Sequence, residues 1–163
     1  MNKRLKGFTL IELLIVIIIL GVMAALITGN FFTSLKKGRD TKRKADLEQI
    51  QRALEMYYED KKAYPVTIDL TFGGKLCETS ACPGTDKVYM QKVPNDPISG
   101  KVYQYFSNDG TNYKLFACLE NNLQMLPYLS TSYTMDCNVA CQDKDGNPVA
   151  KCVWGVSSSN ISP

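Results

Sequence analysis

Hydrophobic residues form one nearly continuous stretch close to the start of the chain. Phe8 to Ile27 is 20 residues long and contains a single charged side chain, Glu12. A helix rises ~1.5 Å per residue, so this stretch would measure about 30 Å, the thickness of the hydrocarbon core of a bilayer. The stretch therefore predicts a membrane-spanning helix.

The pattern becomes amphipathic after this stretch and keeps the helical period. Apolar side chains recur at helical spacing among charged and polar ones, at Leu47, Ile50, Leu54, Tyr57 and Tyr58. The residue before a proline is pushed out of the helical region, so Tyr64 and Pro65 should end the helix near Ala63. We expect one long helix whose outer half buries one stripe against a sheet.

Strand signals begin only at Lys101. Glycine and proline are frequent in Val66–Pro97, which predicts loops. Val102–Ser107 and Tyr113–Glu120 flank a turn of asparagine, aspartate and glycine and predict a hairpin. Weaker strands are expected near Tyr133–Cys141 and Val149–Gly155. The fold class is α+β, a long N-terminal helix on a small antiparallel sheet.

The charge of Glu12 within the apolar stretch costs free energy on insertion into a membrane, so the side chain needs a partner that neutralises it. A carboxylate at the centre of a bilayer costs about 2.5 to 3.5 kcal/mol on insertion scales, and less near the end of the span. Together with Gly7 and Phe8, it resembles the class III signal of type IV pilins and type II secretion pseudopilins. In that family a prepilin peptidase cuts after the glycine of a short basic leader, and the new N-terminal residue is methylated. The resemblance implies cleavage between Gly7 and Phe8, and pairing of Glu12 with the terminal amine of a neighbouring subunit.

Two other readings of the N-terminal segment compete with the pilin signal. A secretory signal has its small-residue cleavage site after the apolar core, whereas Gly7 precedes the core here. A plain single-pass anchor explains the length of the segment but not Glu12.

A second resemblance covers the following region. Tyrosine and proline that close the helix, and an Asp-Pro-x-x-Gly element before the first strand, are typical of major pseudopilins. The matching residues are Tyr64, Pro65, Asp96, Pro97 and Gly100. The two resemblances together cover roughly Lys6 to Glu120 and imply a pilin-like fold. We therefore divide the chain into a leader (1–7), a membrane half (8–27) and an amphipathic half (28–64) of the helix, and a head (65–163).

The resemblance implies a non-catalytic filament subunit. The function would be that of a type II secretion pseudopilus or of a closely related type IV pilus used for adhesion, motility or DNA uptake. Its partners would be identical subunits, other pilins, prepilin peptidase, the lipid bilayer, and an inner-membrane assembly platform with its ATPase. An alternative of another class is a membrane-anchored extracellular binding module that does not polymerise, and retention of Gly7 would favour it.

Composition removes several other functions. Histidine is absent, which excludes Ser/His/Asp and Cys/His catalytic sites. The leader contains Lys3, Arg4 and Lys6, so 16 of the 19 basic residues remain after cleavage, against 16 acidic residues. A near-neutral subunit argues against nucleic-acid binding as a main role.

All cysteines lie beyond the helix and favour disulfides. They are Cys77, Cys82, Cys118, Cys137, Cys141 and Cys152. Zinc is the alternative, but C-x-x-C pairs do not occur, and an exported head would lie where thiols oxidise. Six cysteines allow 15 different sets of three disulfides, and spacing along the chain favours only one bond, that between Cys77 and Cys82.

The charges beside the predicted span conflict with this export. Six basic residues follow the span, namely Lys36, Lys37, Arg39, Lys42, Arg43 and Lys44. The positive-inside rule alone would place the head in the cytoplasm. The cysteines and the leader overrule it, so we expect a single-pass inner-membrane protein with its head outside the cytoplasm. The basic cluster is expected to be a solvated helix face that also contacts lipid headgroups, with DNA binding a minor alternative.

No cofactor is expected, and the candidate for a bound metal besides zinc is calcium. Asp143, Asp145 and Asn147 imitate the opening of a calcium-binding loop, and the resembling pseudopilins bind calcium in a C-terminal loop. Pro148 and Trp154 replace the glycine and the final glutamate of the calcium loop. The sequence therefore favours a tight hairpin turn over a calcium site.

Overall fold

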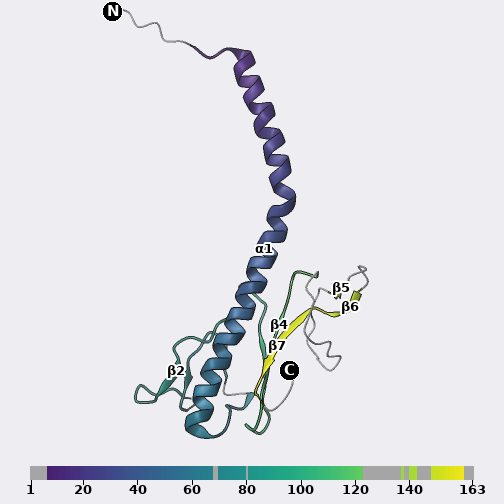
Figure 1. Ribbon diagram of the computed structural model, residues 1–163. Coiled ribbons are helices and arrows are strands. Elements are labelled where there is room, and N and C mark those ends of the chain that lie inside the picture. The colour runs from purple at the N-terminus through teal and green to yellow at the C-terminus, as the bar shows by residue number, and fades with distance from the viewer. Residues whose placement is uncertain are drawn as a thin grey trace, which may run out of the picture. The chain divides into compact units, whose positions relative to one another are not determined.

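A computed structural model describes residues 7–67, 70–79, 81–122, 137, 140–142 and 148–159. Helix α1 runs from Leu10 to Lys61 (Figure 1), close to the predicted bounds. It ends where Lys62 adopts a left-handed backbone with φ 57° and donates its N–H to the carbonyl of Tyr58 at 2.7 Å. A left-handed residue is a common helix stop because it turns the chain away while satisfying a terminal carbonyl. Contacts divide the chain into two compact units, Met1–Lys36 and Lys37–Pro163, and the second contains the head.

The central sheet of the head has three antiparallel strands in the order β3-β4-β7. Strand β3 is Gln104–Phe106, β4 is Lys114–Cys118 and β7 is Val153–Ser157. The β3–β4 pair confirms the predicted hairpin, with Tyr105 opposite Leu115.

The turn of this hairpin touches the end of the helix. Gly110 has a φ of +73° and accepts a hydrogen bond from the N–H of Tyr64 at 2.7 Å. A Cβ atom at Gly110 would lie 2.9 Å from the carbonyl oxygen of Tyr64. Glycine is therefore required here by both the backbone conformation and the close approach.

The stripe predicted on α1 packs on this sheet. Leu47, Ile50 and Leu54 are fully buried, and their cluster includes Tyr105, Tyr113, Leu115 and Ala117 from the hairpin. Tyrosine rings extend the core to the end of the helix, with the Tyr64 and Tyr113 centroids 4.7 Å apart. The apolar face of the outer half of the helix thus makes the core of the head.

Two short sheets complete the described structure. Strands β1 (Leu76–Cys77) and β2 (Val88–Met90) pair in antiparallel fashion, so the prediction of Val66–Pro97 as loop throughout was wrong at these residues. Strands β5 (Ala140–Gln142) and β6 (Pro148–Lys151) form the other pair. The predicted strand Val149–Gly155 is divided, because its first part pairs with β5 and its second part, in β7, pairs with β4.

Candidate functional site

The N-terminal end of α1 is built by two side chains that cap it. Thr9 donates from both its backbone N–H and its hydroxyl to Glu12 Oε2, each at 2.8 Å. The N–H of Glu12 donates in return to Thr9 Oγ1 at 3.2 Å. This reciprocal arrangement is a capping box, which satisfies backbone N–H groups that the first helical turn leaves without acceptors. In a single chain, the carboxylate of Glu12 therefore caps its own helix.

The predicted cleavage residues lie just before this cap. Gly7 and Phe8 are exposed and precede the first helical residue, Leu10. Phe8 is 85% exposed, and a Cβ atom at Gly7 would meet nothing within 4 Å. Nothing among the described residues hinders access of an enzyme to the bond between them.

The apolar side chains of the first unit are exposed along the helix. They include Leu10, Leu13, Ile15, Ile17, Ile19 and Leu20, each about half exposed or more. Apolar surface of this extent requires a lipid or protein environment. No single described helix is long and apolar enough to cross a membrane by itself, and Leu10–Leu26 with Phe31–Lys61 meets that test only as a bent pair.

The structure divides the basic residues at positions 36–44 by role. Arg43 is 2% exposed, and Arg39 donates to both carboxylate oxygens of Glu120 at 2.9 and 2.5 Å. The ammonium of Lys44 lies 4.5 Å from the ring centroid of Trp154, a cation–π contact. The remaining three lysines are exposed on α1. The expectation of one solvated basic face was therefore wrong for Arg43, whereas Arg39 remains 34% exposed while it pairs with Glu120.

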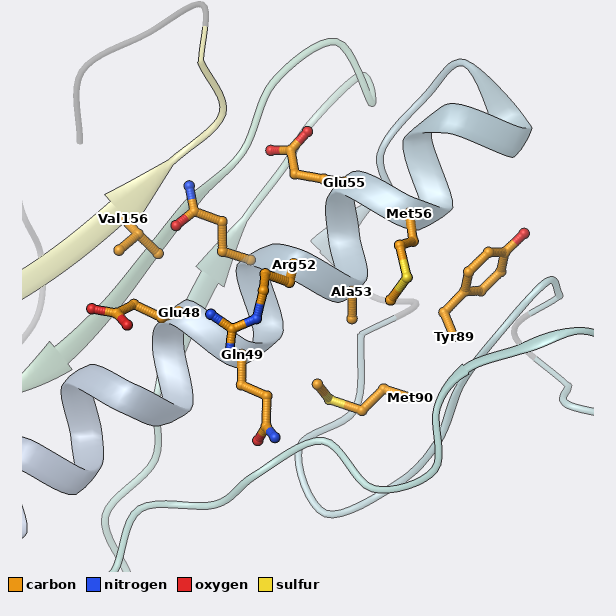
Figure 2. Close-up of a pocket in the computed structure, with 10 residues that line it drawn as sticks. Glu48, Gln49, Arg52, Ala53, Glu55, Met56, Tyr89, Met90 and Val156 are labelled. Atoms are coloured by element: carbon orange, nitrogen blue, oxygen red, sulfur yellow. The ribbon is translucent and has the colours of Figure 1, made fainter.

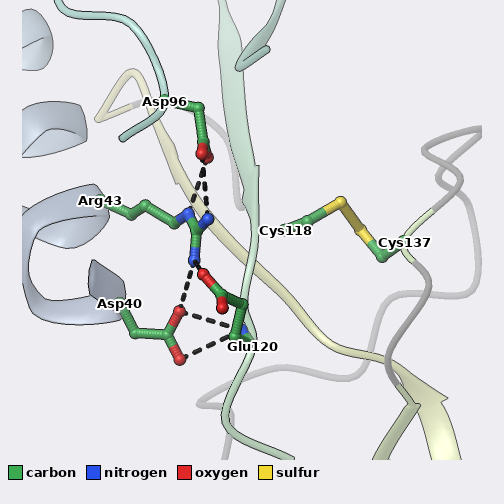
Figure 3. The surroundings of a disulfide bond; sticks show 6 residues. All are labelled: Asp40, Arg43, Asp96, Cys118, Glu120 and Cys137. Atoms are coloured by element: carbon green, nitrogen blue, oxygen red, sulfur yellow. Dashed lines mark hydrogen bonds and ion pairs between the residues drawn. A yellow bond between two sulfur atoms is a disulfide. The ribbon is translucent and has the colours of Figure 1, made fainter. Parts of the chain in front are cut away.

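Arg43 is the centre of an ion cluster inside the head (Figure 3). Its Nε and Nη2 donate to the two carboxylate oxygens of Asp96 at 2.7 and 2.9 Å. Its Nη1 donates to Asp40 Oδ1 at 2.8 Å and to Glu120 Oε1 at 2.7 Å. We call Arg39, Asp40, Arg43, Asp96 and Glu120 the Arg43 cluster.

Backbone groups complete the cluster. Asp40 accepts the N–H groups of Glu120 and Asn121 at 2.9 and 2.8 Å, and Asp96 accepts that of Ile98 at 2.8 Å. Asp40 and Asp96 are nearly fully buried. A buried charge is tolerated only when it is paired and hydrogen-bonded, and these carboxylates meet both conditions.

The charges of the cluster reinforce one another. The hydrogen bond from Arg39, with those from Arg43, outweighs burial and lowers the pKa of Glu120 to about 2. Burial alone would lower the pKa of Arg43, but its bonds to Asp96 and Glu120 outweigh that effect and raise it. Both groups therefore stay ionised at neutral pH, and the cluster fastens α1 to the segment after β2 and to the end of β4.

Sequence reasoning missed this cluster because it grouped Arg39 and Arg43 with the exposed lysines. The available signal was their spacing relative to the core stripe. Asp40 and Arg43 precede Leu47 and Ile50 at helical intervals, which places them on the same buried face of α1.

Disulfides hold two parts of the head, as the cysteine count predicted. Cys77 bonds to Cys82, and Cys118 bonds to Cys137, with sequence separations of 5 and 19. Cys152 is also disulfide-bonded, whereas the side chain of Cys141 lies outside the described part of the chain. Cys118 lies two residues before Glu120, so one disulfide is adjacent to the Arg43 cluster (Figure 3).

The candidate calcium ligands, Asp143, Asp145 and Asn147, lie outside the described residues. Within the described ranges, His, Cys, Asp and Glu side chains form no group that could hold a metal ion.

Comparisons with known proteins match nearly the whole N-terminal three quarters of the chain. Residues 2–28 match the prokaryotic N-terminal methylation motif, and residues 30–123 match type II secretion system (T2SS), protein G. The type II secretion system core protein G of Aeromonas hydrophila is 32% identical over 109 residues, which cover 65% of this chain and 76% of that protein. The protein of the same name from Klebsiella pneumoniae is 34% identical over 108 residues, which cover 64% and 76%. That of Escherichia coli K12 is 30% identical over 99 residues, which cover 59% and 68%. No solved structure gives a significant match.

Proposed function

The chain belongs to the type II secretion system protein G family, and from this premise we propose that it builds the filament of a type II secretion pseudopilus as a non-catalytic structural subunit. The observation that carries the proposal is the succession of two matches, the methylation motif over residues 2–28 and the protein G family over residues 30–123. The long helix that packs on a small antiparallel sheet agrees with this role.

A deletion of the gene tests this function. Deletion should lower the amount of exported proteins in the culture medium while their amount in the cell stays the same or rises, and the intact gene should restore export. Unchanged export with loss of surface filaments would contradict the proposal and favour a type IV pilus used for adhesion, motility or DNA uptake.

Processing and assembly use the N-terminal motif in this proposal. Prepilin peptidase would cut between Gly7 and Phe8, and Glu12 would exchange its contacts with Thr9 for the terminal amine of an adjacent subunit. The exposure of Gly7 and Phe8 and the position of Glu12 at the helix start support this order of events. A chain that retained Gly7 would instead act as an anchored binding module that does not polymerise.

The proposed topology follows from the helix and the cysteines. The subunit has a membrane-anchored N-terminal helix. We propose that residues 8–27 span the inner membrane, that residues 28–64 form the amphipathic half of the helix, and that the head, residues 65–163, lies outside the cytoplasm. Disulfides in the head support this side, because they persist in oxidising compartments. Thiol labelling tests the disulfides, because the cysteines of the denatured, unreduced head should not react with a thiol reagent. Proteolysis tests the side of the membrane, because a protease that cannot cross the inner membrane should cleave the head in cells with a permeabilised outer layer.

Other partners are proposed from the same family. Further pseudopilins would join the filament, and an inner-membrane platform with its ATPase would extract the subunits. Pull-down of the platform with the wild-type chain, but not with a chain lacking residues 8–27, would support this arrangement.

A further inference from the structure

The head carries an open groove that none of the described residues fills. The groove has a volume of about 1080 Å³ and lies between the outer half of α1, strand β2 and strand β7 (Figure 2). Its lining includes Glu48, Arg52, Met56, Tyr89, Met90 and Val156. Met56 is 52% exposed, although it is a large apolar side chain. The groove thus combines an apolar surface rich in methionine, which adapts readily to a partner, with charged groups from α1.

A different segment of α1 exposes apolar surface that the predicted membrane span does not cover. Phe31, Phe32 and Leu35 are 54%, 63% and 42% exposed, and they follow the span predicted to end at Ile27. Lys36 and Lys37 come directly after them and are exposed. This segment is therefore apolar with a cationic end. It matches a groove whose apolar surface carries two carboxylates, Glu48 and Glu55, and one guanidinium, Arg52.

We propose that the groove receives the segment 31–37 of a second copy of the chain. The proposal rests on the proposed function, since only a filament brings many copies together. Phe31, Phe32 and Leu35 would cover the methionine-rich surface, and Lys36 or Lys37 would lie near Glu48.

The proposed contact joins two different patches, the groove of one copy and the segment 31–37 of another. When such a contact is not reciprocal, each copy leaves a free groove at one end and a free segment at the other. The contact then repeats into an open filament wherever the rotation between copies does not close a ring.

Site-directed crosslinking of the full-length chain in membranes tests the contact. Leu35→Cys with Met56→Cys in one chain should give a ladder of crosslinked oligomers on mild oxidation, and neither single variant should. The matched control combines Leu35→Cys with Val102→Cys, because Val102 is also exposed (62%) but does not line the groove. Wild-type-like filaments without the ladder, or an equal ladder from the control, would overturn the proposal alone. Absence of filaments from the wild-type chain would overturn the proposed function and this inference with it.

Charge exchange provides a second test. Glu48→Lys and Lys37→Glu should each lower the yield of sheared filaments by about tenfold, and the two together should restore most of it. Glu59→Lys is the control, since Glu59 is an exposed carboxylate of the same helix outside the groove. If Lys37 binds lipid headgroups instead, Lys37→Glu alone will reduce filaments and Glu48→Lys will not rescue it, which would refute the contact.

Discussion

Arg43 and Asp96 form a bidentate ion pair inside the head, with donor–acceptor distances of 2.7 and 2.9 Å. Both side chains are no more than 3% exposed, and 53 residues separate them in the sequence. Asp96 belongs to the Asp-Pro-x-x-Gly element that the sequence singled out, so the structure gives that element a physical role. The element provides the carboxylate that accepts two hydrogen bonds from an arginine of the long helix.

Asp96→Ala should lower the free energy of unfolding by about 3 kcal/mol, because it leaves part of a buried guanidinium without its partner. Urea denaturation of the full chain in detergent measures this quantity. The control is Glu78→Ala, which breaks the exposed pair with Lys61 and should cost less than about 1 kcal/mol. Equal stability of the two variants would contradict the importance of the buried pair.

Glu120 should make stability depend on pH in the acid range. Its pKa is lowered from 4.5 to about 2 in the folded protein, so its contribution is fully present above about pH 4.5 and is lost as the pH falls through about 2. Glu120→Gln removes this contribution, so the stability difference between wild type and variant should shrink over that interval. A difference that stays constant as the pH falls would contradict the shift.

The Cys118–Cys137 disulfide closes the longer of the two described loops and should stabilise the head more than Cys77–Cys82. Chain-entropy arguments give about 3 kcal/mol for a separation of 19 residues and about 2 kcal/mol for 5 residues. Unfolding of the two paired Cys→Ala variants of the full chain compares them directly. If the Cys77/Cys82 variant lost more stability than the Cys118/Cys137 variant, the loop-length argument would be contradicted, and local strain or residual structure in the unfolded chain would outweigh loop entropy.

Mature protein should begin at Phe8 with a methylated amine. Gly7 and Phe8 are exposed before the helix and lie within the matched methylation motif. Intact-mass spectrometry of protein from cells with prepilin peptidase distinguishes this species from one that begins at Met1. Persistence of the unprocessed form in those cells would contradict the assignment of the cleavage site.

Glu12→Gln separates helix capping from pairing between subunits. An amide oxygen can still accept from Thr9, so the cap would remain, but the negative charge would be gone. Pairing with a cationic amine predicts that Glu12→Gln fails to form filaments as fully as Glu12→Ala does. Neither variant should fail in membrane insertion, since loss of the charge makes insertion easier by at most about 3 kcal/mol. A membrane-fraction blot beside a filament-shearing assay measures both steps, and normal filaments from Glu12→Gln would reduce the role of Glu12 to capping.

Local pattern predicted the elements that local forces control. The helical period, the proline after Tyr64 and the turn before Tyr113 predicted α1 and the β3–β4 hairpin to within a few residues. Short strands within 66–97 escaped prediction because two or three residues of β1 and β2 carry no detectable alternation. Their pairing depends on contacts between segments, which a local pattern does not record.

The sequence by itself determined the N-terminal motif, the apolar stretch, the stripe that forms the core, and the expectation of disulfides. Each depends on spacing along a few turns of helix or on residue type alone. Only the tertiary structure decided which carboxylates pair with Arg43, because Asp96 and Glu120 arrive from distant segments. It likewise decided that β7 pairs with β4 and that α1, β2 and β7 leave a groove between them. Long-range pairing and the fit of side chains are properties of the assembled chain, and no local period encodes them.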